Sequence, residues 1–194
     1  MKKLTLATLL IFSCATAWAA DFDKGVAAYN AGDSATALAE FKPLAEQGDA
    51  VAQYNVALMY ANGEGVIEDD KEAVKWYRLA AEQGIAEAQY NLGNMYDNGE
   101  GVIEDDKEAV KWFRLAAEQG GADAQSKLGF RYGTGQGVIQ DNVYAHMWWN
   151  LAAASGNEAA RSNKDILVKQ MTPQDISKAQ DLARECVKKN YKDC

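Results

Sequence analysis

A stretch of 23 residues, NGEGVIEDDKEAVKWYRLAAEQG, occurs twice in this chain. The copies cover residues 62–84 and 98–120, and they differ only where Tyr77 becomes Phe113. With its flanking residues the unit is 36 residues long, and three copies follow one another: 50–85, 86–121 and, more loosely, 122–157. Periods of this size are typical of helical hairpins, which stack because no single unit buries both of its apolar faces. We therefore predict an all-α fold, an α/α superhelical solenoid of helix-turn-helix repeats.

The second helix of each unit has a recognisable start, face and end. Asp69 is placed as an N-cap, and Glu72 follows three residues later, as in a capping box. Apolar residues then recur at i, i+3, i+4, i+7 and i+8 and form one face, which includes Trp76. Gly84 follows the last apolar residue and can adopt the left-handed backbone conformation that ends a helix. Because the tryptophans have this core spacing, we interpret them as helix-packing residues rather than as a sugar-binding surface.

The first helix of each unit contains a small residue beside its apolar stripe. Gly93 has this place in the second unit, and Ala57 and Gly129 have it in the others. A glycine inside a helix costs about 1 kcal/mol relative to alanine. Close approach of a neighbouring helix is the usual compensation, so we predict such an approach at this position.

The segments on either side of the repeats also have helical patterns. Residues 20–49 predict a further helical hairpin, and residues 158–194 predict two capping helices that cover the last repeat. A straight helix would separate Cys186 from Cys194 by about 12 Å, too far for a disulfide. A bond between them therefore requires the helix to end near Asn190 and the tail to fold back. We favour this disulfide over two free thiols or a zinc site.

The first 19 residues have the form of a secretory signal. A basic start and the apolar segment 4–12 precede Ala17-Trp18-Ala19, which offers small residues at the positions a signal peptidase reads. We expect cleavage after Ala19, or else after Ala20, and hence a periplasmic or secreted protein. The alternative is a lipoprotein signal ending at Cys14, which the bulky residue before Ser13 disfavours.

The chain is acidic. Its 20 Lys and Arg and 28 Asp and Glu give a net charge of −8, and loss of the predicted signal with its two lysines gives −10. Nucleic acids and anionic lipids are bound by clustered Lys and Arg, so nucleic acid is not an expected partner. No second apolar run reaches the length of a membrane span, so we expect no integral membrane segment after signal removal.

We assign no catalytic, metal-binding or cofactor-binding motif. His146 is the only histidine and replaces Val74 and Val110, which indicates a packing or surface role. The motifs Ser-x-x-Lys and Gly-x-Ser-x-Gly and a phosphate-binding loop do not occur. The acidic runs after the turns suit helix caps better than a calcium loop. We therefore expect a protein that is not an enzyme and takes no cofactor or metal.

The pattern A-x-x-Q-Y-N-L-G-x-M-Y-x-N-G-x-G-V-x-x-D-x-x-x-A-x-x-W-Y-x-x-A-A-x-x-G resembles the Sel-one-like repeat, a relative of the tetratricopeptide repeat. The resemblance covers residues 50–157 in three copies, and the flanking hairpin and C-terminal segment also look like those of bacterial members of the family. It implies an α/α superhelix and an adaptor that binds protein or peptide partners. One branch, the cysteine-rich proteins of Helicobacter, is described as penicillin-binding with weak β-lactamase activity. Its repeats each carry a cysteine pair, whereas no repeat of this chain contains cysteine.

Differences between the first two units indicate a candidate binding face. Seven of the 36 positions differ, and three of them (51/87, 58/94 and 61/97) share one face of the first helix with Tyr54 and Tyr90. In the tetratricopeptide-like stacking that the repeat resembles, this face lines the concave groove. The candidate binding residues are Tyr54, Leu58, Glu87, Tyr90, Asn94, Asp97, Asp123 and Phe130.

Aromatic side chains beside acidic ones suit a neutral or basic peptide or protein segment. The alternative is that these positions are tolerated surface changes after a duplication. We therefore expect an exported scaffold that binds a protein or peptide through its concave groove. Two other functions stay open: a weak cell-wall-related activity, β-lactam-binding or β-lactamase-like, and a structural part in an envelope complex.

Overall fold

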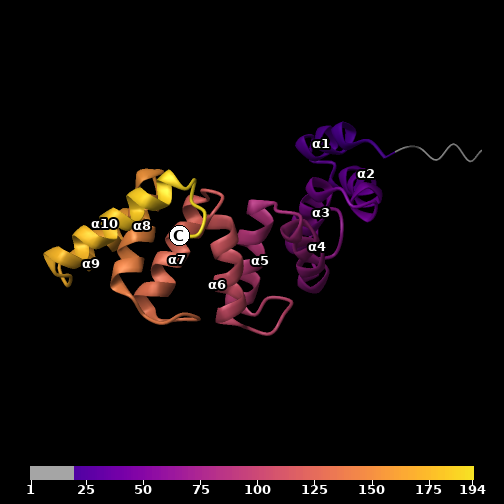
Figure 1. The fold of residues 1–194 in the computed structure, drawn as a ribbon. Coiled ribbons are helices and arrows are strands. Elements are labelled where there is room, and N and C mark those ends of the chain that lie inside the picture. Colours follow the sequence, from indigo (N-terminus) through magenta and orange to yellow (C-terminus); the bar gives the residue numbers. More distant parts are fainter. Residues whose placement is uncertain (1–19) are drawn as a thin grey trace, which may run out of the picture.

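The computed structural model describes residues 20–194, so the predicted signal at 1–19 and Cys14 lie outside the described residues. In this part of the chain the regular structure is ten α-helices: α1 (Phe22–Asn30), α2 (Ser34–Glu46), α3 (Ala50–Asn62), α4 (Asp70–Glu82), α5 (Ala86–Asn98), α6 (Asp106–Ala117), α7 (Ala122–Thr134), α8 (Asn142–Ala154), α9 (Glu158–Val168) and α10 (Pro173–Lys188). From α1 to α9 each helix packs against the next, and α10 packs on α8. The hairpins follow one another in a curved row (Figure 1). The predicted all-α solenoid is confirmed.

The second helices begin at the predicted aspartates. The carboxylate of Asp69 accepts hydrogen bonds from the backbone N–H groups of Lys71 and Glu72, at 3.0 and 3.1 Å. The reciprocal half of the capping box does not form. The backbone N–H of Asp69 donates instead to the carbonyl oxygen of Tyr60, at 3.0 Å, and the Glu72 carboxylate accepts from Lys75. The start of α4 is thus tied to the end of α3.

The small residue in the first helix marks a close helix contact, as predicted. A Cβ atom added to Gly93 would lie 2.7 Å from ring carbons of Phe113, and one added to Gly129 would lie 2.5 Å from Trp149. Real Cβ atoms do not approach other heavy atoms so closely. Glycine at these two positions therefore lets the aromatic ring of α6 or α8 lie directly on the preceding helix.

The tryptophans of the second helices lie in the core. Trp76, Trp112 and Trp148 are all buried. Trp112 of α6 belongs to the core cluster that is otherwise built from α2 to α5. This ring therefore joins the second repeat to the first.

A buried glutamine in the first helix of each repeat ties that helix to the preceding hairpin. Nε2 of Gln89 donates to a carbonyl oxygen near the end of α4, at 3.0 Å, and Oε1 accepts from Nε2 of Gln119, at 2.8 Å. Gln53 makes the equivalent pair of contacts. In the third repeat Ser155 stands where the donor amide would be, and Oε1 of Gln125 is buried without a hydrogen-bond partner.

The tail reverses direction after α10. Asn190 and Tyr191 have positive φ values of 51° and 64°, and Cys186 is joined to Cys194 by a disulfide. The Tyr191 ring lies 3.5 Å from the position that a Cβ atom on Gly120 would take. The folded-back tail therefore lies against the end of α6.

Candidate binding groove

The first helices of the three repeats line a groove that consists of three adjoining cavities. The first cavity, of about 320 Å³, is lined by residues of α3, α5, α6 and α7, among them Tyr54. The second, also about 320 Å³, shares Tyr90 and Asp123 with the first. The third, of about 210 Å³, shares Phe130 and Asn163 with the second. We call this continuous surface the groove. It runs from α3 to α9.

Aromatic rings form the apolar part of the groove, and the second helices hold two of them in place. The Tyr54 ring packs on Tyr77, with 6.0 Å between ring centroids, and the Tyr90 ring packs on Phe113, at 5.9 Å. Phe130 is 45% exposed. Because two rings rest on buried neighbours, little side-chain freedom is lost when a ligand covers them.

Acidic side chains lie beside these rings. Glu87 on α5 is exposed, and Asp123 at the start of α7 accepts a hydrogen bond from Nδ2 of Asn157, at 2.8 Å. Burial, and then the negative charge of Glu87, raise the pKa of Tyr54 above its ordinary value. The Tyr54 hydroxyl therefore stays protonated in the physiological range and can donate a hydrogen bond. The groove combines apolar rings, a neutral donor and the negative charges of Glu87 and Asp123, and Lys127, which pairs with Asp97, is the positive side chain of its lining.

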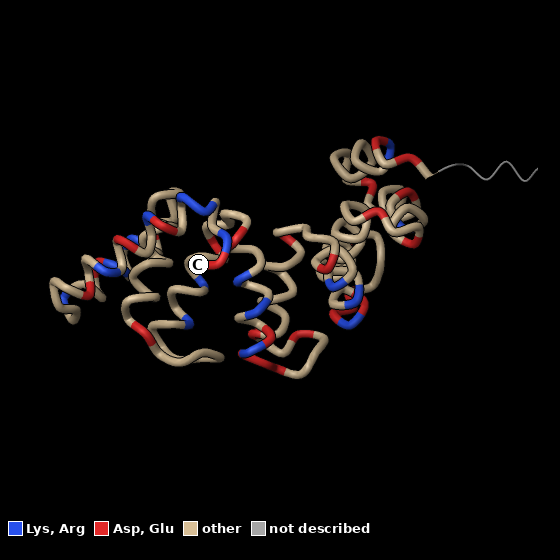
Figure 2. The backbone as a smooth tube through the Cα atoms, viewed as in Figure 1, with Lys and Arg blue, Asp and Glu red and all other residues tan. Residues whose placement is uncertain are grey.

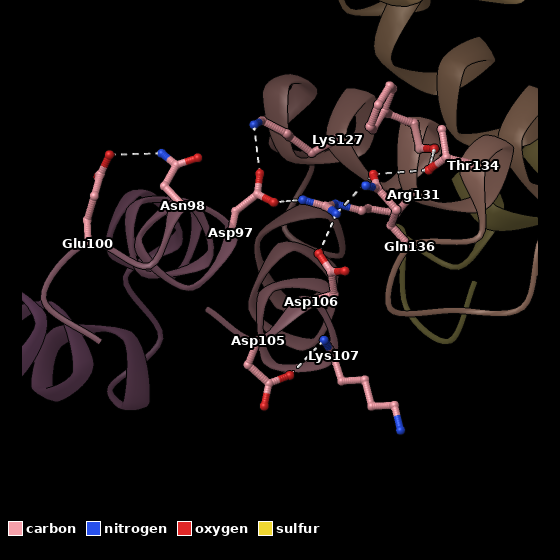
Figure 3. A network of polar contacts seen from close by, with 11 residues as sticks. Asp97, Asn98, Glu100, Asp105, Asp106, Lys107, Lys127, Arg131, Thr134 and Gln136 are labelled. Carbon is pink, nitrogen blue, oxygen red and sulfur yellow. Dashed lines mark hydrogen bonds and ion pairs between the residues drawn. The ribbon is translucent and has the colours of Figure 1, made fainter. Parts of the chain in front are cut away.

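Asp97 lines none of the three cavities and lies in a polar network at the boundary between the second and third repeats (Figure 3). Its carboxylate pairs with the guanidinium of Arg131 and with Nζ of Lys127, the latter at 3.2 Å. The Arg131 side chain is 4% exposed and also pairs with Asp106, at 2.7 Å. Asp97 therefore contributes to the contact between repeats, and its charge is already compensated.

The structure brings five of the eight predicted binding residues to the groove. These are Tyr54, Glu87, Tyr90, Asp123 and Phe130. Leu58 packs against the first core cluster instead, and Asn94 is partly buried outside the three cavities.

Sequence reasoning missed several groove residues, among them Asn91, Lys127, Asn163 and Ile166. Asn91 follows Tyr90 directly and could have been found by widening the predicted face. Lys127 was harder to find from the sequence, because it falls in the divergent third repeat. Asn163 and Ile166 belong to α9, which the sequence predicted only as a cap.

The other titratable side chains singled out in the sequence form no site. His146 is 2% exposed, and burial, together with the positive charge of Lys164, lowers its pKa. Within residues 20–194 no group of three or more His, Cys, Asp or Glu side chains is placed to hold a metal ion. In the same range, no helix is long and apolar enough to cross a membrane.

A family model of the Sel1 repeat matches residues 50–85, 86–121 and 122–157, which together make up more than half of the chain. The chain belongs to the Sel1 repeat family. Members of this family commonly serve as scaffolds for protein–protein interaction.

Two solved structures are similar to this Sel1 repeat protein. A Sel1 repeat protein from Oxalobacter formigenes is 41% identical with a TM-score of 0.61, over 66% of this chain and 96% of that one. A protective antigen of uropathogenic Escherichia coli with the same repeat fold is 29% identical, also with a TM-score of 0.61. That match covers 88% of this Sel1 repeat protein and 46% of the antigen. A comparison with curated proteins finds no match.

Proposed function

We propose that this Sel1 repeat protein is an exported adaptor that binds a segment of a partner protein in the groove. One observation carries the proposal: three cavities that share residues form a continuous groove across all three repeats and α9. An elongated groove fits an extended peptide better than a compact small molecule. Its rings supply apolar contact, and Glu87 and Asp123 favour a segment that is neutral or basic.

Photocrosslinking from inside the groove tests this proposal. The photoreactive residue p-benzoylphenylalanine would replace Phe130, which is 45% exposed in the groove. A matched control would place it at Leu115, which is 38% exposed on α6 and lines none of the three cavities. We expect a partner protein in envelope or secreted fractions to crosslink to position 130 and not to position 115. Equal crosslinking from both positions, or none from 130, would contradict a groove-bound partner.

A groove variant separates specific binding from general adhesion. We define it by three changes: Glu87→Lys, Tyr90→Ala and Phe130→Ala. A partner held in the groove should be recovered at least tenfold less by this variant than by the wild type. The outer-face control Leu79→Ala and Leu115→Ala should recover it normally, because both leucines lie on the second helices outside the groove. Circular dichroism would verify that both variants are folded.

Export rests on the sequence pattern of residues 1–19 and is supported by the disulfide, because such bonds persist in oxidising compartments. The intact mass of protein purified from its native cell tests it. We expect a chain that begins at Ala20 and lacks two hydrogens because Cys186 and Cys194 are joined. A chain that retains residues 1–19 would exclude cleavage, and two free thiols would exclude the disulfide.

A further inference from the structure

The turns between the two helices of each repeat carry the most exposed large apolar side chains of the described chain. Ile67, Ile103 and Ile139 are 87%, 90% and 89% exposed, and no other large apolar side chain in residues 20–194 exceeds 54%. The three isoleucines are 36 residues apart and therefore occupy the same place in successive repeats. A single exposed isoleucine is ordinary on a protein surface, whereas a repeated one in register forms a surface.

The backbone holds each isoleucine rigidly in this exposed position. The preceding valine is partly buried, and Val102 and Val138 pack against core clusters. Two residues after each isoleucine, an aspartate N–H donates to a tyrosine carbonyl oxygen, as Asp105 does to Tyr96 at 3.0 Å. Each isoleucine thus lies between two anchored residues. Its exposure follows from the path of the turn.

The three turns lie along one edge of the solenoid. A Cβ atom on Gly101 would lie 2.3 Å from the carbonyl oxygen of Asp70, and one on Gly137 would lie 2.3 Å from that of Asp106. One on Gly65 would lie 2.5 Å from the carbonyl oxygen of Ser34 in α2, so each turn rests on the start of the second helix in the preceding hairpin. Figure 1 shows the turns that join α5 to α6 and α7 to α8 at the same edge. We call this surface, with its three isoleucines, the turn edge.

The turn edge is negatively charged. Residues 62–71 and 98–107 each contain four acidic residues and one lysine, a net charge of −3, whereas residues 134–143 contain one acidic residue. In the second turn one of these charges, that of Asp106, is compensated by Arg131. Glu68 and Glu104, which directly follow the isoleucines, are exposed. Figure 2 shows acidic residues gathered in the turn before α6. The charge is thus concentrated on the first two turns, and the third is nearly neutral.

We propose that the turn edge binds a segment of a partner protein in which apolar residues alternate with Lys or Arg. The isoleucines supply apolar contact on a rigid frame, so little conformational freedom is lost on binding. The carboxylates select a cationic partner and disfavour both an anionic lipid surface and the same edge of a second copy. Because the carboxylates lie mainly on the first two turns, the Lys or Arg residues that face these turns contribute most of the electrostatic attraction. This surface is separate from the groove.

A peptide titration tests the proposal with the mature, folded protein. The probe is a fluorescein-labelled peptide of eight Lys-Leu pairs, followed by fluorescence anisotropy at about 0.15 M salt, where weak surface electrostatics are screened. A second peptide of eight Lys-Ser pairs has the same charge without the apolar side chains. We expect the Lys-Leu peptide to bind at least tenfold more tightly than the Lys-Ser peptide.

Two triple variants locate the binding. The edge variant carries Ile67→Ala, Ile103→Ala and Ile139→Ala, and its matched control carries Val26→Ala, Val51→Ala and Val187→Ala, which removes exposed apolar side chains elsewhere. We expect at least a tenfold loss of Lys-Leu affinity in the edge variant and less than a twofold change in the control. Exchange of Glu68 and Glu104 for glutamine should weaken binding severalfold.

The groove variant distinguishes this inference from the proposed function. Because the groove also favours a basic segment, the groove variant leaves the turn edge as the site for the Lys-Leu peptide, and the three isoleucine changes made in this variant should cost the same tenfold in affinity. Equal affinity of edge variant and wild type, loss of binding in the groove variant alone, or no saturable binding to the wild type would each overturn the inference. None of these results depends on whether a natural partner crosslinks from position 130.

Discussion

Arg131 of α7 forms an ion pair with Asp97 of α5 across the boundary between the second and third repeats. At the preceding boundary the equivalent residues are Met95 and Ala61, which belong to one apolar core cluster. The two boundaries of this solenoid therefore use different chemistry on the same backbone frame.

Removing one member of this pair should be costly, and removing both should not. Asp97→Ala leaves the buried Arg131 with Asp106 as its one remaining carboxylate partner, and we expect a loss of about 3 kcal/mol in the free energy of unfolding. The double variant Asp97→Ala and Arg131→Met recreates the residues of the first boundary and should recover to within about 1 kcal/mol of the wild type. Urea denaturation measures both, and additive losses would contradict coupling between the two side chains.

Trp112 should be among the most important side chains for stability. It is 5% exposed and joins the second repeat to the core of the first, so Trp112→Ala should cost about 3–5 kcal/mol in chemical denaturation. Leu115→Ala on the same helix is the control and should cost less than about 1 kcal/mol, because Leu115 is 38% exposed. A loss below 1 kcal/mol for Trp112→Ala would show that this core assignment is wrong.

Ser155→Gln should stabilise the protein. The new amide would stand where Gln119 stands in the preceding repeat and would donate to the unpartnered Oε1 of Gln125. We expect a gain of about 0.5–1.5 kcal/mol, the usual net value of a hydrogen bond. The control is Ser155→Leu, which adds similar bulk without a donor. Equal stability of the two variants would exclude the hydrogen bond as the cause.

Two glycines in one turn should differ in their tolerance of alanine. Gly99 and Gly101 have nearly the same φ, 71° and 68°, but an added Cβ atom would have its nearest neighbour at 3.4 Å in the first case and 2.3 Å in the second. Gly99→Ala should cost about 1 kcal/mol from the backbone conformation alone. Gly101→Ala should cost a further 1–3 kcal/mol, because the methyl group meets the backbone of Asp70. Similar midpoints in urea would argue against close contact between turn and helix.

His146 should make the protein sensitive to mild acid. Because burial lowers its pKa in the folded state, the unfolded chain, with a pKa of about 6.5, binds the proton first. Stability is therefore fully present above about pH 6.5 and falls as the pH drops below it. His146→Val, the residue of the other two repeats, should abolish the fall in urea midpoint between about pH 7.5 and 5.5. The same fall in the variant would assign it to other groups.

Much of the frame could be predicted because short-range patterns determine it. The N-caps, the apolar face and Gly93 each depend on residues within one hairpin, and the repeat supplies the long-range packing. The capping box was half wrong, because the N–H of Asp69 is taken by Tyr60 on the neighbouring helix. That contact depends on the path of the turn, which residue types alone do not specify.

The candidate site was less predictable because it lies between repeats. Asp97 was predicted from a comparison of the first two units, whereas its partner Arg131 belongs to the third. Reading all three units together would have shown that a buried methionine position becomes arginine one repeat after an alanine becomes aspartate. The exposed isoleucines had no such signal, since their exposure depends on how each turn rests on the preceding helix.

The ion pair between Asp97 and Arg131 also affects which changes in repeat number this protein can tolerate. Unequal recombination between the gene segments that encode residues 62–84 and 98–120 would add or remove 36 residues at a time. Gain of a unit would keep one Asp97 in front of Arg131 but place a second Asp97 in front of Met95, where no arginine pairs with it, whereas loss would put Ala61 in front of Arg131 and leave the guanidinium with one fewer counter-charge. The ion pair thus makes a change of length costly in either direction, and it favours an array with the three repeats that this chain has.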